Sequence, residues 1–267
     1  MIAVQKAGDS NSSGRTTFLE NLMKILFSPA EDKISLSDLP PINSKNFIFN
    51  ELYKKRFEIL KLYDNFVQNA TITELSRVFG LKKETEILQY KNEIFKSGTI
   101  KAILRYNGVA YKALQYRSLN KQAQNFIDKN VIIFSNLFGP ILAENAVPNY
   151  KLKQGEKFCD INVENFYKQN FSENIDKFIE NDDILDLRAG FYNKFYDIKK
   201  EYLTMKFIKN GKVISHFAKY FRGKILKEIA QNQLDNNKKI IAFNFTDLKL
   251  IEIHKIQNRT EILYKII

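Results

Sequence analysis

The sequence predicts a mixed α/β domain, with a central mixed sheet surrounded by helices, from three observations. Short apolar runs rich in β-branched residues, such as VIIFS at 131–135, alternate with segments whose apolar residues recur at helical spacing. Strand-like runs become more frequent towards the end of the chain. The 267 residues are 44% hydrophobic and include 22 Phe and 13 Tyr, enough apolar material for a substantial core. We therefore expect a single domain over 23–267, preceded by a polar extension at 1–22.

The first half of this domain is expected to alternate short strands with helices. In chain order, the patterns predict a strand at 24–28, a helix at 47–67, two helical segments within 71–95, a short strand and then a helix containing Tyr111 within 100–114, a helix at 118–129 and a buried strand at 131–135. Gly80 separates the two helical segments of 71–95, and Thr73 is expected to cap the first of them. A turn is expected at Asn107-Gly108.

The second half is expected to begin with a loop, because Gly139, Pro140 and Pro148 interrupt the residues after 135. In chain order, the patterns then predict a helix at 160–179, a buried strand at 183–187, a hairpin over 201–217 that turns at Asn210-Gly211, a helix at 217–231 and strands at 239–244, 249–256 and 261–267.

The charge of the chain points to a polyanionic partner. The net charge is +12, although the large share of Lys and Asn also fits an AT-rich genome and weakens that argument. The distribution is more informative: 199–227 holds nine cations and one acid, 101–121 holds five cations and no acid, and 172–186 holds six acids and one Lys. The charges are therefore segregated along the chain rather than spread evenly.

Several classes of protein are disfavoured by the composition. No apolar run is long enough to span a membrane, and the first 22 residues lack a signal-peptide pattern. A single cysteine, Cys159, excludes internal disulfides and fits a reducing, cytoplasmic location. His216 and His254 are the only histidines, and neither lies in a recognisable catalytic or metal-binding pattern. We predict no catalytic residue, no metal and no cofactor.

The helix at 217–231 carries the clearest candidate site. Ala218, Phe221, Ile225 and Ile229 form one apolar stripe, which leaves Lys219 and Arg222 together on a flank near the helix start. Cations are disfavoured there by the helix dipole, and a bound phosphate would reverse that effect. Pairing of these cations with a carboxylate from 172–186 is the alternative. Gly223, inside the helix, predicts close packing or a close ligand.

The predicted phosphate contacts lie on two separate parts of the chain. One part is the helix at 217–231 with the preceding hairpin, and the other is the segment 71–95. The candidates are Lys219, Arg222, Lys224, Lys212, Lys82 and Lys83. Segment 71–95 has the length of a helix–tight turn–helix that binds phosphate, and it partly resembles a helix-turn-helix with Glu86 at an expected apolar position. An ordinary helical hairpin is the alternative.

Short motifs in a fixed order resemble a known family. They are MKILFSPA from Met23, YNGVAYKALQ with Tyr111, FSNLFGPI followed by NYKLKQG with Tyr150, DLRAGFYNK with Lys194, and ISHFAKYFRGKI with Ser215, Lys219 and Arg222. Together they cover most of 23–245 and resemble the YaaA peroxide-stress family. The sequence departs from the family pattern at Glu31, where a lysine is expected, and at Val109, where an acid is expected. The chain is therefore identified as a divergent member.

This resemblance implies a fold and a function. It implies a single α/β domain with a basic cleft, a helix–hairpin–helix element, binding to double-stranded DNA and a role in limiting peroxide and iron damage. Residues 71–95 are the candidate for the helix–hairpin–helix element. Tyr111, Tyr150, Lys194 and Ser215 are expected to line the cleft. We favour sequence-tolerant DNA binding. An enzyme that holds a small phosphorylated or nucleotide substrate with Lys219 and Arg222 is the alternative, and a partner-binding protein without either activity is a third reading.

The geometry around Lys219 and Arg222 separates the first two functions. A closed, concave pocket shared with tyrosines would favour the small substrate, whereas an open basic groove as wide as a duplex would favour DNA.

Overall fold

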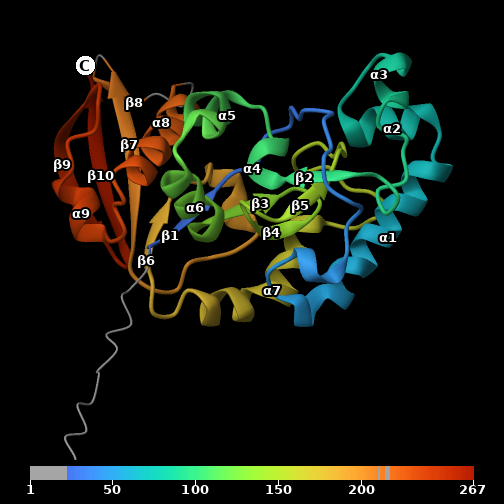
Figure 1. Cartoon of the computed structure of the whole chain (residues 1–267), viewed down its shortest axis with the longest axis horizontal. Helices are drawn as coiled ribbons and strands as arrows, with labels where there is room; N and C mark the ends of the chain where they lie inside the picture. The colour runs from blue at the N-terminus through green and yellow to red at the C-terminus, as the bar shows by residue number, and fades with distance from the viewer. Residues whose placement is uncertain (1–22, 210, 214–216) are drawn as a thin grey trace, which may run out of the picture.

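The computed structural model describes residues 23–209, 211–213 and 217–267, which form a mixed α/β domain around one large sheet (Figure 1). The sheet has the strand order β4-β3-β1-β6-β7-β10-β9, with β8 paired to β7. Its strands are β1 (Met23–Phe27), β3 (Val131–Ser135), β4 (Gly139–Leu142), β6 (Asp183–Asp186), β7 (Tyr202–Lys209), β8 (Lys212–Val213), β9 (Leu248–Ile256) and β10 (Arg259–Ile266). The predicted fold class, a single mixed α/β domain, is confirmed.

The pairing of the strands explains the mixed character of the sheet. β3, β1, β6, β7 and β10 run parallel to their neighbours, while β4, β8 and β9 are antiparallel additions. β1 and β3 lie inside the sheet and are buried along their whole length, as their continuous apolar sequences predict. A separate pair is formed by β2 (Thr99–Lys101) and β5 (Ala146–Pro148).

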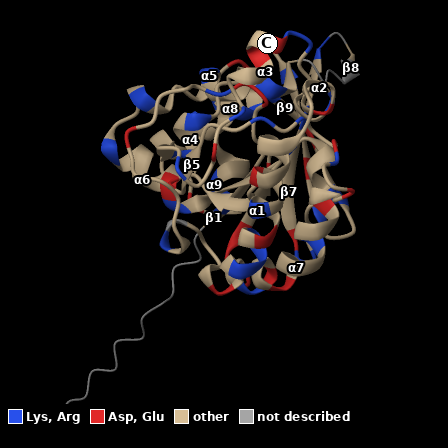
Figure 2. Cartoon of the chain, turned by 90° about the vertical axis from the view of Figure 1, so that its right-hand side faces the viewer, with Lys and Arg blue, Asp and Glu red and all other residues tan. Residues whose placement is uncertain are grey.

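The helices pack around this sheet. They are α1 (Tyr53–Asn69), α2 (Ile72–Phe79), α3 (Glu84–Leu88), α4 (Ala102–Arg105), α5 (Val109–Leu114), α6 (Lys121–Asn130), α7 (Val163–Phe178), α8 (Ala218–Gln231) and α9 (Asn237–Ala242), with a 3-10 helix η4 at Gly190–Lys194. In Figure 1, α8 and α5 lie side by side near β7, whereas α2 and α3 lie at the opposite end of the molecule. Figure 2 shows acidic residues on α7 with lysines among them, so charge of both signs is present there.

The predicted orientation of α8 is confirmed. Ala218, Phe221, Ile225 and Ile229 are all buried. Gly223 provides the close approach that its position inside a helix predicted: a Cβ atom there would lie 1.9 Å from the carbonyl oxygen of Ala110 in α5. The two helices therefore touch through their backbones, and this contact fixes how closely α5 and α8 approach one another.

The predicted loop after residue 135 is wrong, because it contains β4 and β5. Pro140 lies in β4, opposite Phe134 of β3. β4 stands at the end of the strand order and pairs on one side only among the described residues, so the missing N–H of Pro140 costs no ladder hydrogen bond. Gly139 is required at the start of this strand by its φ of +65° and by Tyr167, whose Cδ1 would lie 2.3 Å from an added Cβ.

Two further predictions about local structure are corrected. The expected strand at 239–244 is the helix α9, which Asn236 caps by accepting a hydrogen bond from the backbone N–H of Lys239. The cap of α2 is Thr71 rather than Thr73, in a reciprocal capping box with Glu74. The predicted helix at 47–67 begins only at Tyr53.

The strand β9 ends the sheet and pairs only with β10 among the described residues. Four of its side chains, Leu250, Ile251, Ile253 and Ile256, are more than 40% exposed.

Candidate functional site

A pocket of about 320 Å³ lies where β1 and β6 end. These strands are parallel neighbours, and the chain leaves β1 towards β3 on one side but leaves β6 towards β7 on the other. Such a reversal at the carboxyl ends of parallel strands leaves a crevice that α/β proteins use for ligands. The pocket is lined by residues 27–32 at and after the end of β1, by Leu187, Ala189 and Tyr192 after β6, by the start of α5, by Gln154 and by α8.

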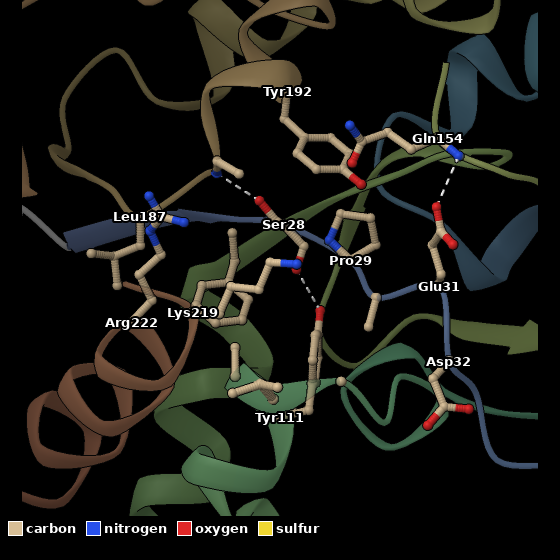
Figure 3. A pocket seen from close by; sticks show the side chains of 16 residues that line it. Ser28, Pro29, Glu31, Asp32, Tyr111, Gln154, Leu187, Tyr192, Lys219 and Arg222 are labelled. Carbon is tan, nitrogen blue, oxygen red and sulfur yellow. Dashed lines mark hydrogen bonds between the residues drawn. The ribbon is translucent and has the colours of Figure 1, made fainter. Parts of the chain in front are cut away.

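Lys219 and Arg222 both line this pocket from α8 (Figure 3). α8 begins at Ala218, so Lys219 lies in the first turn and Arg222 at the start of the second. No acidic residue lies in that first turn, and Phe217 provides no side-chain cap. The backbone N–H groups of the turn and the two cations therefore give this side of the pocket a positive potential.

Arg222 faces the pocket without a carboxylate partner in the part of the chain that the structure describes. Burial lowers the pKa of its guanidinium, while the Asp186 carboxylate acts in the opposite direction. Asp186 is already engaged: Arg188 donates to its Oδ1 and Oδ2 at 2.9 Å each. Among the described residues, no carboxylate lies within ion-pair distance of Lys219 or Arg222. The expected alternative, an ion pair with a carboxylate of 172–186, is therefore not formed there, and only a longer-range attraction between Arg222 and Asp186 remains.

The floor of the pocket is held by hydrogen bonds to Ser28. The Tyr111 hydroxyl donates to the Ser28 carbonyl oxygen at 2.9 Å, and the Ala189 N–H donates to Ser28 Oγ at 2.8 Å. Burial raises the pKa of Tyr111 well above its ordinary value, so its hydroxyl stays protonated. Tyr192, on the opposite wall, donates to Oδ1 of Asn136 at 3.1 Å. The two tyrosines therefore present fixed aromatic surfaces to the pocket.

The end of the pocket away from α8 is acidic. Glu31 and Asp32 line it and are both exposed. The backbone N–H of Gln154 donates to Glu31 Oε1 at 3.3 Å, and Asn107 donates to Asp32 Oδ2 at 3.0 Å. The pocket therefore has cations at one end and carboxylates at the other, rather than a uniformly basic lining.

Tyr150 lies beneath this site and does not line it. Its hydroxyl shares hydrogen bonds with Ser135 Oγ at 2.7 Å and with the Tyr106 hydroxyl at 2.9 Å. The Lys33 ammonium stands 4.2 Å from the centre of the Tyr150 ring and donates to the carbonyl oxygens of Ala30 and Glu31. Burial and the nearby Lys151 lower the pKa of Lys33 to about 7. This buried cluster supports the loop that forms the acidic end of the pocket.

The other predicted site residues lie apart from the pocket. Lys224 forms an ion pair with Asp247, and Lys194 stacks on the Phe191 ring with its Nζ 5.0 Å from the ring centre. Lys82 and Lys83 are exposed between α2 and α3, where Lys83 pairs with Glu86 at 3.7 Å. Ser215 and the Lys212 side chain lie outside the described residues.

Sequence reasoning did not select Ser28, Glu31, Asp32 or Tyr192 as site residues. Their positions in the sequence could have indicated them, because Ser28 to Asp32 directly follow one buried strand and Tyr192 follows another. Residues at the carboxyl ends of neighbouring parallel strands converge in space. Within the described residues, no group of three or more His, Cys, Asp or Glu could hold a metal ion. None of the helices there combines the length and apolar character needed to cross a membrane.

Comparison with known proteins places the chain in a family. The family model described as "Peroxide stress protein YaaA" matches residues 23–253. This chain belongs to the YaaA peroxide stress family. An uncharacterized protein of Campylobacter jejuni is 48% identical over 245 residues, which cover 92% of this chain and 100% of that protein. The match ends within β9, so it covers the other described strands of the sheet except β10, and it includes every segment that lines the pocket.

More distant relatives also match the chain over most of its length. A UPF0246 protein of Fusobacterium nucleatum is 28% identical over 228 residues, covering 82% of this chain and 90% of that protein. A UPF0246 protein of Corynebacterium glutamicum is also 28% identical, over 220 residues that cover 79% of this chain and 86% of that protein. The predicted family is thereby confirmed, and membership supports a role in peroxide stress.

Proposed function

We propose that the chain serves the peroxide-stress response by binding the phosphate group of a small ligand in the pocket after β1 and β6. The observation that carries this proposal is the position of Lys219 and Arg222, which face one concave pocket together and have no carboxylate partner among the described residues. A phosphate there would meet both cations and the first-turn N–H groups of α8. It would also supply the negative charge that the start of this helix lacks.

The dimensions of the site favour a small ligand over a duplex. A volume of about 320 Å³ accommodates a compact metabolite. The backbone contact between Gly223 and Ala110 holds α5 and α8 together on one side. Glu31 and Asp32 on the other side would repel a phosphate backbone that continued through the pocket.

Isothermal titration calorimetry with inorganic phosphate and with ribose 5-phosphate tests this proposal. We expect both to bind, and we expect Arg222→Gln or Lys219→Gln to weaken binding by about tenfold or more, because each removes a charged hydrogen-bond donor. Lys82→Gln is the matched control, since that exposed lysine lies on the far α2–α3 turn. Equal affinities of the wild type and the Arg222→Gln variant would contradict the assignment.

Double-stranded DNA is the second candidate partner, and the charge distribution favours it. Nine of the cations lie in 199–227, where only one acid is present. Lys82 and Lys83 are exposed on a turn between two short helices, which supports a helix–hairpin–helix role for 71–95. In this proposal Lys212, Lys219 and Lys224 contact phosphates without reading bases.

Fluorescence anisotropy with a labelled duplex at increasing salt tests DNA binding. Affinity should fall steeply with salt, because each phosphate contact releases a counterion. A Lys82→Glu and Lys83→Glu double variant should weaken binding equally for unrelated sequences. The proposal is refuted if no duplex binds at about 50 mM salt.

A further inference from the structure

The pocket after β1 and β6 has opposite charges at its two ends. Figure 3 shows Lys219 and Arg222 on one side and Glu31 with Asp32 on the other, and all four line the same cavity. None of these four side chains forms an ion pair with another of them, so the charges are not neutralised across the pocket. A ligand that spans the cavity would therefore meet donors at one end and acceptors at the other.

The middle of the pocket is apolar and aromatic. Pro29, Tyr111 and Tyr192 lie between the charged ends (Figure 3), and Phe27 and Leu187 add further apolar surface to the lining. The hydroxyls of Tyr111 and Tyr192 already donate to protein acceptors, at 2.9 Å and 3.1 Å, so mainly the ring surfaces of these residues remain for a ligand. Such walls suit a sugar or a planar ring rather than a further charge.

We propose that this pocket binds a nucleoside 5′-monophosphate lengthwise. The phosphate lies against Lys219 and Arg222, the sugar and base lie along the aromatic walls, and hydroxyl or amino donors of the nucleoside reach Glu31 and Asp32. This inference rests on the proposed function, and adds to it the class of ligand and the direction in which the ligand lies.

The two carboxylates make the site selective for ligands with phosphate at one end only. Carboxylates accept hydrogen bonds from ribose hydroxyls and amino groups but repel a second phosphate. A nucleoside 3′,5′-bisphosphate should therefore bind more weakly than the 5′-monophosphate, although it carries more negative charge. A uniformly basic site would give the reverse order.

The test compares four ligands by calorimetry on the full chain: inorganic phosphate, ribose 5-phosphate, adenosine 5′-monophosphate and adenosine 3′,5′-bisphosphate. We expect the monophosphate to bind about tenfold more tightly than inorganic phosphate, and the bisphosphate to bind more weakly than the monophosphate. Equal affinity for monophosphate and inorganic phosphate would overturn the inference while leaving the phosphate site intact. Failure of every ligand, inorganic phosphate included, would instead overturn the proposed function.

A double variant, Glu31→Gln with Asp32→Asn, tests the contribution of the two carboxylates to ligand selection. Both replacements keep an oxygen that can accept the present hydrogen bonds from Gln154 and Asn107, and both positions are exposed, so the fold should be retained. In this variant the bisphosphate should bind at least as tightly as the monophosphate. Glu84→Gln, at an exposed position of α3, is the matched control and should leave the wild-type order of affinities unchanged. If the double variant also keeps that order, the carboxylates do not select the ligand.

Discussion

Gly223 in α8 lies directly against the carbonyl group of Ala110 in α5, so closely that a Cβ atom would stand 1.9 Å from the oxygen and 2.7 Å from the carbon. Ala110 lines the pocket, and Lys219 and Arg222 lie in the part of α8 just before Gly223. The distance between these two walls of the site therefore depends on a residue without a side chain.

Replacing Gly223 by Ala should destabilise the protein, although Ala is the better helix former. The added methyl group must displace backbone, and overpacking against backbone this close costs up to about 3 kcal/mol, which outweighs the ~1 kcal/mol gained in helix propensity. Denaturant unfolding measures the difference. Gly190→Ala is the control, because nothing lies within 4 Å of its Cβ position. Equal or greater stability of the Gly223→Ala variant would mean that α5 and α8 separate freely.

The buried pair of Arg188 and Asp186 should contribute strongly to stability. Arg188 also donates to the carbonyl oxygens of Tyr192 and Tyr196, which holds η4 beside the pocket. Arg188→Met leaves a carboxylate without its partner and should lower the free energy of unfolding by about 3–5 kcal/mol. Adding Asp186→Leu should restore part of the loss, since no buried charge then remains. Thermal unfolding of the single and double variants checks this, and additive losses would argue against the explanation.

Lys33 should make stability depend on pH. In the unfolded chain it keeps its proton up to about pH 10.5, whereas in the folded protein it releases the proton near pH 7. Between these values the unfolded state binds more protons, so the free energy of unfolding rises with pH through this window. Below about pH 7 the destabilisation caused by the buried charge is fully present.

Comparing the wild type with Lys33→Met isolates this effect. The wild type should gain stability relative to the variant as the pH rises from 7 towards 10, measured by denaturant unfolding at each pH. Lys45→Met, at an exposed position, should show no such trend. A constant difference between wild type and Lys33→Met across this range would show that the folded and unfolded states titrate alike at Lys33.

Cys159 should react slowly with hydrogen peroxide. Loss of solvation, together with the Asp160 and Glu74 carboxylates, raises the pKa of its thiol above the ordinary value. A smaller share of the thiol than usual is then ionised at neutral pH, and the thiolate is the reactive form. The rate of thiol loss under peroxide should be no faster than for free cysteine, and Cys159→Ser should bind phosphate as the wild type does. Rapid sulfenic acid formation would contradict this.

Strong apolar patterns made parts of the fold predictable. β1, β3 and α8 were anticipated because their buried residues follow one another, or recur at helical spacing, without interruption. β4 was missed because Pro140 usually ends a strand, and only its place at the sheet edge removes the conflict. α9 was missed because its short apolar run fits a strand as well as a helix, and the Asn236 cap decided between them.

The candidate site was predictable only in part. Lys219 and Arg222 stood out because they share a flank of one helix, which a local pattern reveals. Their place opposite Glu31 and Asp32 in one pocket depends on long-range packing, in which β1 and β6, more than 150 residues apart in the chain, lie side by side. Tyr150 was expected in the cleft, but it is buried in the interior, where its hydroxyl forms hydrogen bonds with Tyr106 and Ser135. Local patterns do not carry such tertiary information.

The strand β9, which pairs only with β10 among the described residues, bears on how the protein behaves at high concentration. Unpaired strand edges with apolar side chains recruit other strands and lead to aggregation. Along β9 a charge stands at every third position, Lys249, Glu252 and Lys255, so no more than two apolar residues follow one another. Solubility along this edge thus depends on three evenly spaced charges, and neutralising them would turn the end of the sheet into a site of fibril growth.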